Sequence, residues 1–266
     1  SGAVRVGAYQ IGITGLITEN SANFSETITV VGAHQIDRKG VTVNLSSSVE
    51  KVYDGTTSMN NVSLNLTGRV SNGDLIDAVG VTGVGEYDSP NAGTNLGFSI
   101  NQLALSGADS GNYFLIGGNQ LTGSNGVITP KAVTLTAPVV SKTYDGNSAY
   151  TLSEADLAAI TNSGALVQGE TITAATVMFN NRHVGVGNKT LSLSSVTASS
   201  GNGNYTFTLN ANSTSTINQL ASATWVGGDG NWTDANNWAV TGNLGQTGVL
   251  PDGGNVALAI IPASFS

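Results

Sequence analysis

The residues that could carry out catalysis are few in this sequence and lie far apart. His34 and His183 are the two histidines, and cysteine is absent. Neither the G-x-S-x-G turn of serine hydrolases nor the H-E-x-x-H motif of zinc hydrolases occurs. We therefore predict that the protein is not an enzyme, and we expect both histidines at solvated strand positions.

A tyrosine-aspartate-glycine motif occurs twice and offers the best-defined local chemistry. The copies are Tyr53-Asp54-Gly55 and Tyr144-Asp145-Gly146. An aspartate can accept a hydrogen bond from the backbone two residues on, and glycine adopts a positive φ without steric cost, so the motif predicts a tight turn. The alternative is a calcium site at Asp54 or Asp145. One carboxylate falls far short of the six to eight oxygens that Ca²⁺ prefers, so no cofactor is expected.

A lysine precedes each of these tyrosines by two residues, at Lys51 and Lys142. Long lysine side chains usually keep the amino group in water, so an exposed lysine is expected at both positions. The alternative is an isopeptide bond to a neighbouring Asn or Asp, which would lower the intact mass by one ammonia or one water.

Three tryptophans lie within fourteen residues near the end of the chain, at Trp225, Trp232 and Trp238. Exposed indole rings would form a stacking platform for sugar rings, and Asp229 and Asp234 would then supply nearby polar groups. Buried indoles would instead cap the preceding modules, because tryptophan suits positions that need a large apolar body with one N–H donor.

Composition excludes two classes of partner. Lys and Arg number 9 against 17 Asp and Glu, a net charge of −8, so the chain lacks the clustered cations that bind nucleic acid. No apolar run approaches the roughly 18 residues of a membrane span. We expect neither nucleic-acid binding nor membrane insertion.

Two ordered landmarks repeat along the chain. The Tyr-Asp-Gly motif recurs after 91 residues, and an Asn-Tyr marker at Asn112-Tyr113 recurs 92 residues later at Asn204-Tyr205. A related marker, Ser21-Ala-Asn23-Phe24, lies 89 residues before the first. We therefore predict four parts, which are the second half of a truncated repeat at 1–39, complete repeats at 40–131 and 132–220, and a different module at 221–266.

Within each repeat the apolar residues alternate with polar ones, as in Tyr205-Thr-Phe207-Thr-Leu209. This period of two predicts half-buried strands. The fold class is therefore all-β, as an elongated tandem array of β-rich modules. An immunoglobulin-like sandwich is favoured for each module, and a β-grasp-like sheet with one short helix is the alternative. Residues 153–160 combine an N-cap serine with early carboxylates and predict that helix.

Together these landmarks resemble the YDG repeat of large bacterial secreted adhesins of the filamentous-haemagglutinin, two-partner-secretion type. The resemblance rests on the Tyr-Asp-Gly motif, the later Gly-acid pairs Gly73-Asp74 and Gly169-Glu170, and the Asn-Tyr markers. The tail segment Trp225–Trp238 resembles the W-x-G-G-x-G-x-W segment of passenger regions in autotransporters and related exoproteins.

These resemblances imply a fragment of an extracellular bacterial adhesin, secreted or on the cell surface, whose stalk repeats support attachment to host surfaces or a biofilm matrix. The expected partners are neighbouring repeats of the same chain and host-surface or exopolysaccharide glycans. Two alternatives stay open. One is a passive spacer without a ligand, and the other is an accessory module of a carbohydrate-active enzyme.

Overall fold

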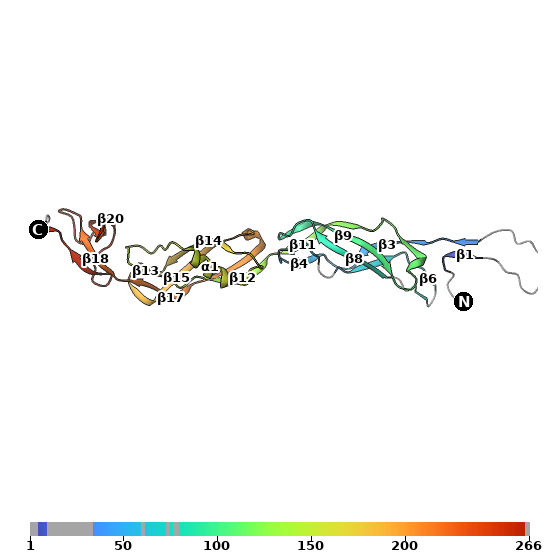
Figure 1. Ribbon diagram of the computed structural model, residues 1–266, viewed down its shortest axis with the longest axis horizontal. Helices are drawn as coiled ribbons and strands as arrows, with labels where there is room; N and C mark the ends of the chain where they lie inside the picture. The colour runs from blue at the N-terminus through green and yellow to red at the C-terminus, as the bar shows by residue number, and fades with distance from the viewer. Residues whose placement is uncertain (1–4, 10–33, 60–61, 73–74, 77–79, 264–266) are drawn as a thin grey trace, which may run out of the picture. The chain divides into compact units, whose positions relative to one another are not determined.

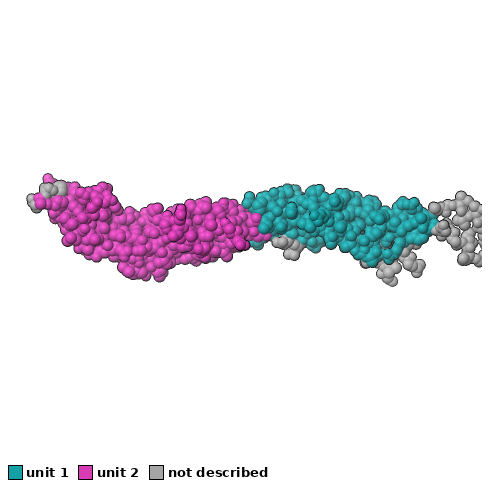
Figure 2. Space-filling model, in the orientation of Figure 1, with its two compact units in different colours: residues 1–52, 56–129 teal, residues 53–55, 130–266 magenta. Residues whose placement is uncertain are grey.

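The computed structural model describes residues 5–9, 34–59, 62–72, 75–76 and 80–263 (Figure 1). The chain divides into two compact units (Figure 2). Unit 1 comprises Ser1–Val52 and Thr56–Thr129, and unit 2 comprises Tyr53–Gly55 and Pro130–Ser266. The first Tyr-Asp-Gly motif therefore groups with unit 2, although the residues on both sides of it belong to unit 1.

The described part of unit 1 is built mainly of strands. A two-stranded antiparallel sheet pairs β1 with β2, and two larger sheets have the strand orders β10-β3-β5 and β4-β11-β9-β8. The strands are β1 (Gly7–Tyr9), β2 (His34–Ile36), β3 (Lys39–Leu45), β4 (Glu50–Val52), β5 (Leu64–Thr67), β6 (Ser71–Asn72), β7 (Leu75–Ile76), β8 (Gly80–Tyr87), β9 (Gly93–Ser106), β10 (Tyr113–Leu115) and β11 (Leu121–Thr129).

Unit 2 contains the second repeat and the C-terminal module that begins at Leu220, which we call the tail. The repeat pairs β12 with β16 and forms a sheet of order β13-β17-β15-β14, and the tail forms a separate sheet of order β20-β19-β18-β21. The elements are β12 (Lys131–Thr136), β13 (Ser141–Thr143), α1 (Glu154–Asn162), β14 (Ile172–Phe179), β15 (Gly185–Ala198), β16 (Tyr205–Asn210), β17 (Asn212–Asn218), β18 (Leu220–Trp225), β19 (Trp238–Val240), β20 (Asn243–Thr247) and β21 (Val256–Ile260).

The two repeats share the pairing of their opening and closing strands, but β5 pairs with β3 in the first repeat and α1 stands in its place in the second. In each, the opening strands pair in parallel with the closing strands: β3 with β10 and β4 with β11 in the first, and β12 with β16 and β13 with β17 in the second. A long antiparallel hairpin, β8–β9 or β14–β15, lies beside them. The modules are thus mostly β, as predicted. The parallel pairs distinguish these modules from an all-antiparallel sandwich.

The predicted helix is present as α1. The Ser153 hydroxyl accepts a hydrogen bond from the Asp156 backbone N–H at 3.2 Å, and the Asp156 carboxylate accepts one from the Ser153 backbone N–H at 2.9 Å. This reciprocal capping box explains where the helix begins. It is the only α-helix in the described parts of the chain, and it is not long and apolar enough to cross a membrane.

The repeats bury alternate side chains of their strands, as the period of two predicts. Val41 and Ile100 are fully buried in the first repeat, and Leu135 and Leu191 are fully buried in the second. These apolar positions face one side of each sheet, and their burial supplies most of the driving force for folding.

Candidate functional site

Both Tyr-Asp-Gly motifs form the turns that their residue types require. Gly55 has a φ of 77° and Gly146 a φ of 81°, values that glycine adopts readily. In the second turn the Asn147 backbone N–H donates to the Asp145 carboxylate at 3.1 Å. A Cβ atom at Gly146 would lie 2.1 Å from the Gly248 carbonyl oxygen, so this glycine also permits close contact with the tail.

The lysine before the second turn, Lys142, directs its amino group into the turn and binds its oxygen atoms. The Lys142 amino group donates to the Asp145 carboxylate at 2.7 Å and to the Asn147 carbonyl oxygen at 2.8 Å. It also lies 5.7 Å from the centroid of the Phe179 ring. Only 10% of the Lys142 side chain is exposed, so the expectation of an exposed lysine is wrong here. The loop oxygens replace the water that would otherwise solvate the ammonium group.

Lys51 has the same arrangement in the first repeat. Its amino group donates to the Thr56 carbonyl oxygen at 2.7 Å and lies 5.6 Å from the centroid of the Tyr87 ring. The shared position of the two lysines in the repeat was the available sequence signal for this role. Each lysine ties the residues after its turn to the strand before it.

Tyr53 is buried within unit 2, with 4% of its surface exposed. Its hydroxyl donates to Glu170 Oε1 at 2.6 Å, and its ring meets Tyr205 edge to face, with 5.5 Å between the centroids. The sequence predicts Tyr53 as a turn residue and does not indicate Glu170 as its partner. The recurring Gly-acid pair was the signal for that carboxylate.

The Glu170 carboxylate accepts hydrogen bonds from three hydroxyl groups. Besides Tyr53, Tyr205 donates to Oε2 at 2.6 Å and the Ser200 hydroxyl donates to the same oxygen. Burial by itself would raise the pKa of Glu170, but the hydrogen bonds from Ser200, Tyr205 and Tyr53 outweigh it, and the pKa lies below its ordinary value. The carboxylate is therefore held in its charged form.

The same contacts keep the two phenols protonated. Burial, reinforced by Glu170, raises the pKa of Tyr53 and raises that of Tyr205 to about 12. The Tyr205 hydroxyl also accepts a hydrogen bond from the Val167 backbone N–H at 3.0 Å. We call Tyr53, Glu170, Ser200 and Tyr205 the tyrosine lock.

Tyr144 occupies the equivalent position in the second turn but lacks such a lock. It is 1% exposed, and its hydroxyl has no hydrogen-bond partner among the described residues. Burial raises its pKa. Asp252 of the tail raises that pKa further, yet the described residues supply no acceptor for the hydroxyl.

Comparison with known proteins agrees with the repeated geometry. Residues 37–122 and 129–216 each match the family model of the YDG domain. The chain belongs to the YDG-domain family. No curated protein and no solved structure matches it. The tyrosine lock is thus formed by a YDG turn, Tyr53–Gly55, and residues of the second YDG domain.

In each YDG domain the Asn-Tyr marker lies where a short 3-10 helix ends and a strand begins. The Tyr113 hydroxyl accepts the Val70 backbone N–H at 3.1 Å, as Tyr205 accepts that of Val167. Asn112 Oδ1 accepts the Val6 backbone N–H at 3.1 Å. Asn204 is 4% exposed, and its amide donates to the Ser200 carbonyl oxygen at 2.9 Å. The related marker at 21–24 lies outside the described residues.

The three tryptophans form one cluster in the tail, beside the second YDG domain. Trp238 is fully buried and Trp225 is 7% exposed, whereas Trp232 is 45% exposed. The Trp232 ring stacks on Trp225 with 6.4 Å between centroids and meets Trp238 edge to face at 4.4 Å. Of the three rings, only Trp232 offers a face to a ligand, while the other two form the tail core.

The aspartates beside this cluster are exposed. Asp234 Oδ1 accepts the Asn236 backbone N–H at 3.0 Å, and Asp229 lies in the turn between Gly227 and Gly230. In the described parts of the chain, no group of three or more His, Asp or Glu residues is placed to hold a metal ion.

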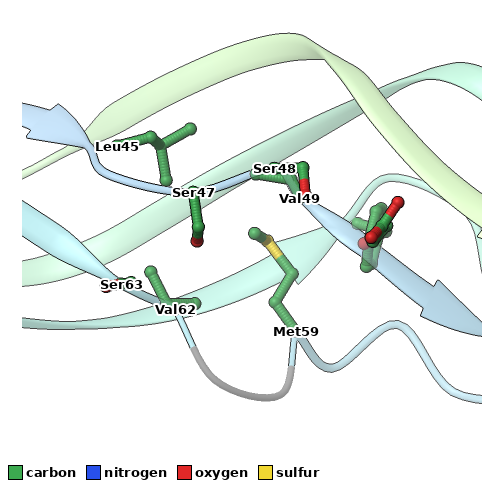
Figure 3. Close-up of a pocket in the computed structure, with 9 residues that line it drawn as sticks. Leu45, Ser47, Ser48, Val49, Met59, Val62 and Ser63 are labelled. Carbon is green, nitrogen blue, oxygen red and sulfur yellow. The ribbon is translucent and has the colours of Figure 1, made fainter.

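The YDG domain of unit 1 has a small pocket of about 180 Å³ (Figure 3). The Met59 side chain extends towards Ser48 and Val49 in it. Its lining residues are Leu45, Ser47, Ser48, Val49, Glu50, Met59, Val62, Ser63 and Tyr87. With a single carboxylate and no histidine, this lining does not provide the paired acid and base of a hydrolytic site.

Proposed function

We propose that this chain is a stalk segment of an extracellular bacterial adhesin of the filamentous-haemagglutinin type, secreted or held at the cell surface. In this proposal the chain acts without catalysis, and its YDG domains support attachment to a host surface or a biofilm matrix. The observation that supports the proposal most directly is the tyrosine lock, because a motif residue of one repeat is used entirely in structural bonds with the next.

Several further observations support a structural role for the motif. The hydroxyl of Tyr53, the carboxylate of Glu170 and the amine of Lys142 are all engaged by the protein itself. A hydrogen bond to a charged group contributes more than one between neutral groups. A turn held by such bonds resists displacement when the chain is pulled, which is what a stalk requires.

Single-molecule pulling of the whole chain from its two ends tests this role. We expect discrete unfolding events for the YDG domains, and we expect Glu170→Ala to lower the force of one of them. Glu86→Ala is the matched control, because Glu86 is an exposed acid on β8. Unchanged forces in a folded Glu170→Ala protein would remove the support for a load-bearing lock.

A second candidate function is glycan binding by the tail, and the exposure of Trp232 favours it. The ring is held by two buried tryptophans, so a sugar could stack on it without first ordering the side chain. We would measure binding to host glycans and bacterial exopolysaccharides, with and without calcium. Saturable binding lost in Trp232→Ala and kept in Leu244→Ala, a change at another exposed apolar residue of the tail, would support it.

Absence of binding to every glycan would favour the passive spacer. Binding retained by Trp232→Ala would move the search for the contact to another surface. An accessory module of a carbohydrate-active enzyme would bind in the same assay, so the alternatives separate by whether the full-length protein carries an enzyme domain.

A further inference from the structure

Asn255 is a buried residue of the tail whose side chain reaches the second YDG domain. It is 3% exposed. Its Oδ1 atom accepts the Val184 backbone N–H at 2.8 Å, and its Nδ2 atom donates to Asp252 Oδ2 at 2.7 Å. Its own carbonyl oxygen accepts the Leu220 backbone N–H at 2.9 Å, which ties it to the first strand of the tail.

The partners of Asn255 fix the orientation of its amide. A backbone N–H can only donate and a carboxylate can only accept, so the oxygen must face Val184 and the nitrogen must face Asp252. The second hydrogen of Nδ2 then points to His183 Nδ1, 3.0 Å away, which must act as the acceptor. The amide is thus preorganised by the tail to take a main-chain donor from the loop before β15.

The same surface of the tail covers the second YDG turn. Val249 is fully buried, and the preceding Gly248 carbonyl oxygen lies against Gly146, where a Cβ atom would approach to 2.1 Å. The ring of Tyr144 is buried, yet its hydroxyl has no partner among the described residues. The specific polar contact of this surface is therefore made by Asn255 and not by the tyrosine hydroxyl.

Unit 1 contains a similar hydrogen bond at the end of a 3-10 helix, Ser110–Asn112. There Asn112 Oδ1 accepts the backbone N–H of Val6 at 3.1 Å. Asn112 belongs to a YDG domain and Asn255 to the tail, and the two lie in different sequence contexts. In both places a side-chain amide accepts from the backbone of a segment that precedes it in the chain.

We propose that the tail is a docking module for the end of a YDG domain and that Asn255 is the residue that recognises it. The partner is a YDG hairpin loop that presents a main-chain N–H beside a glycine turn. The amide binds a main-chain donor at Val184 and a side-chain acceptor at His183, so the surface fits YDG loops that present both. This inference holds whether or not the chain serves as a stalk.

Asn255→Ala in the whole chain tests the proposal by two readouts on the repeat side. We expect hydrogen exchange at the Val184 amide to rise about tenfold, because its acceptor is lost. We also expect chymotrypsin to cleave after Tyr144, because the tail packs against Gly146 two residues later and its release would open this turn. Asn236→Ala, a change at an exposed asparagine of the same module, should alter neither readout.

Two measurements keep the result interpretable. Tryptophan emission reports whether the tail stays folded, since all three tryptophans lie there and Trp238 is fully buried. Val184→Pro removes the donor while leaving the tail sequence intact, and it should expose Tyr144 to the same degree. Retained protection of Tyr144 in both variants, with native emission, would overturn the proposal.

Discussion

The two YDG turns present the same residues to different receiving surfaces. Tyr53 is 4% exposed and its hydroxyl donates to Glu170, which also receives Tyr205. Tyr144 is 1% exposed and its hydroxyl has no partner among the described residues. Burial of the ring is therefore common to both turns, whereas the charge-assisted hydrogen bond belongs to the first.

The difference shows that the motif does not determine what its tyrosine contributes. A buried phenol gains from apolar contact wherever it packs, but its hydroxyl stabilises the fold only where an acceptor is available. The second YDG domain supplies a carboxylate at Glu170, and the tail supplies an asparagine that bonds to the backbone of Val184 instead. Two kinds of contact thus follow from one repeated turn.

Removing the carboxylate should have the largest effect. We expect Glu170→Ala to lower the free energy of unfolding by about 3 kcal/mol, because the hydroxyls of Tyr53, Tyr205 and Ser200 lose their common acceptor. Urea unfolding followed by circular dichroism measures the change, with Glu86→Ala as control. A loss no larger than the control's would show that the lock contributes little.

Removing one donor should cost less. We expect Tyr53→Phe to lower the free energy of unfolding by about 1–2 kcal/mol, since the ring stays buried and Glu170 keeps two other donors. Hydrogen exchange of residues 165–172 should accelerate in the same variant, because that loop carries Glu170. Exchange that stays at the wild-type rate would mean that Tyr53 does not hold this loop.

Acid should weaken the contact between Tyr53 and Glu170. The pKa of Glu170 is lowered in the folded state, so its ionised form stabilises the fold above the unfolded-state pKa of about 4.3, and this contribution is lost as the pH falls through the folded pKa. Glu170→Gln imitates the protonated acid. Wild type should therefore be more stable than Glu170→Gln at pH 7, by less than the Tyr53→Phe effect. The two stabilities should converge as the pH falls through the folded-state pKa of Glu170. If the stabilities of wild type and Glu170→Gln fell in parallel as the pH is lowered, the stabilising role of the ionised carboxylate would be contradicted.

Much of this fold follows from the sequence, and the exceptions have physical causes. Alternating residues gave the strands, and Ser153 with Asp156 marked the helix. Glu170 was visible as a recurring landmark, but no local rule joins a carboxylate to a tyrosine 117 residues away. The expected exposure of Lys142 is wrong, because lysine is usually solvated and the loop oxygens that bind its amino group come together only when the turn folds. The burial of Trp225 and Trp238 likewise depends on tertiary packing.

The smallest effect is expected at the second turn, and it is the sharpest test of the comparison. Tyr144→Phe removes a buried hydroxyl that has no partner among the described residues, so the free energy of unfolding should stay unchanged or rise by up to about 1 kcal/mol. Tryptophan emission during urea unfolding reports on the tail, which packs against Gly146 of the same turn. A clear loss of stability would mean that the hydroxyl does find an acceptor, for example a bound water near Asp252, and the two turns would then differ in the identity of their acceptors. An unchanged or higher midpoint, beside a destabilised Tyr53→Phe, would establish that the receiving surface and not the motif decides the energy of the contact.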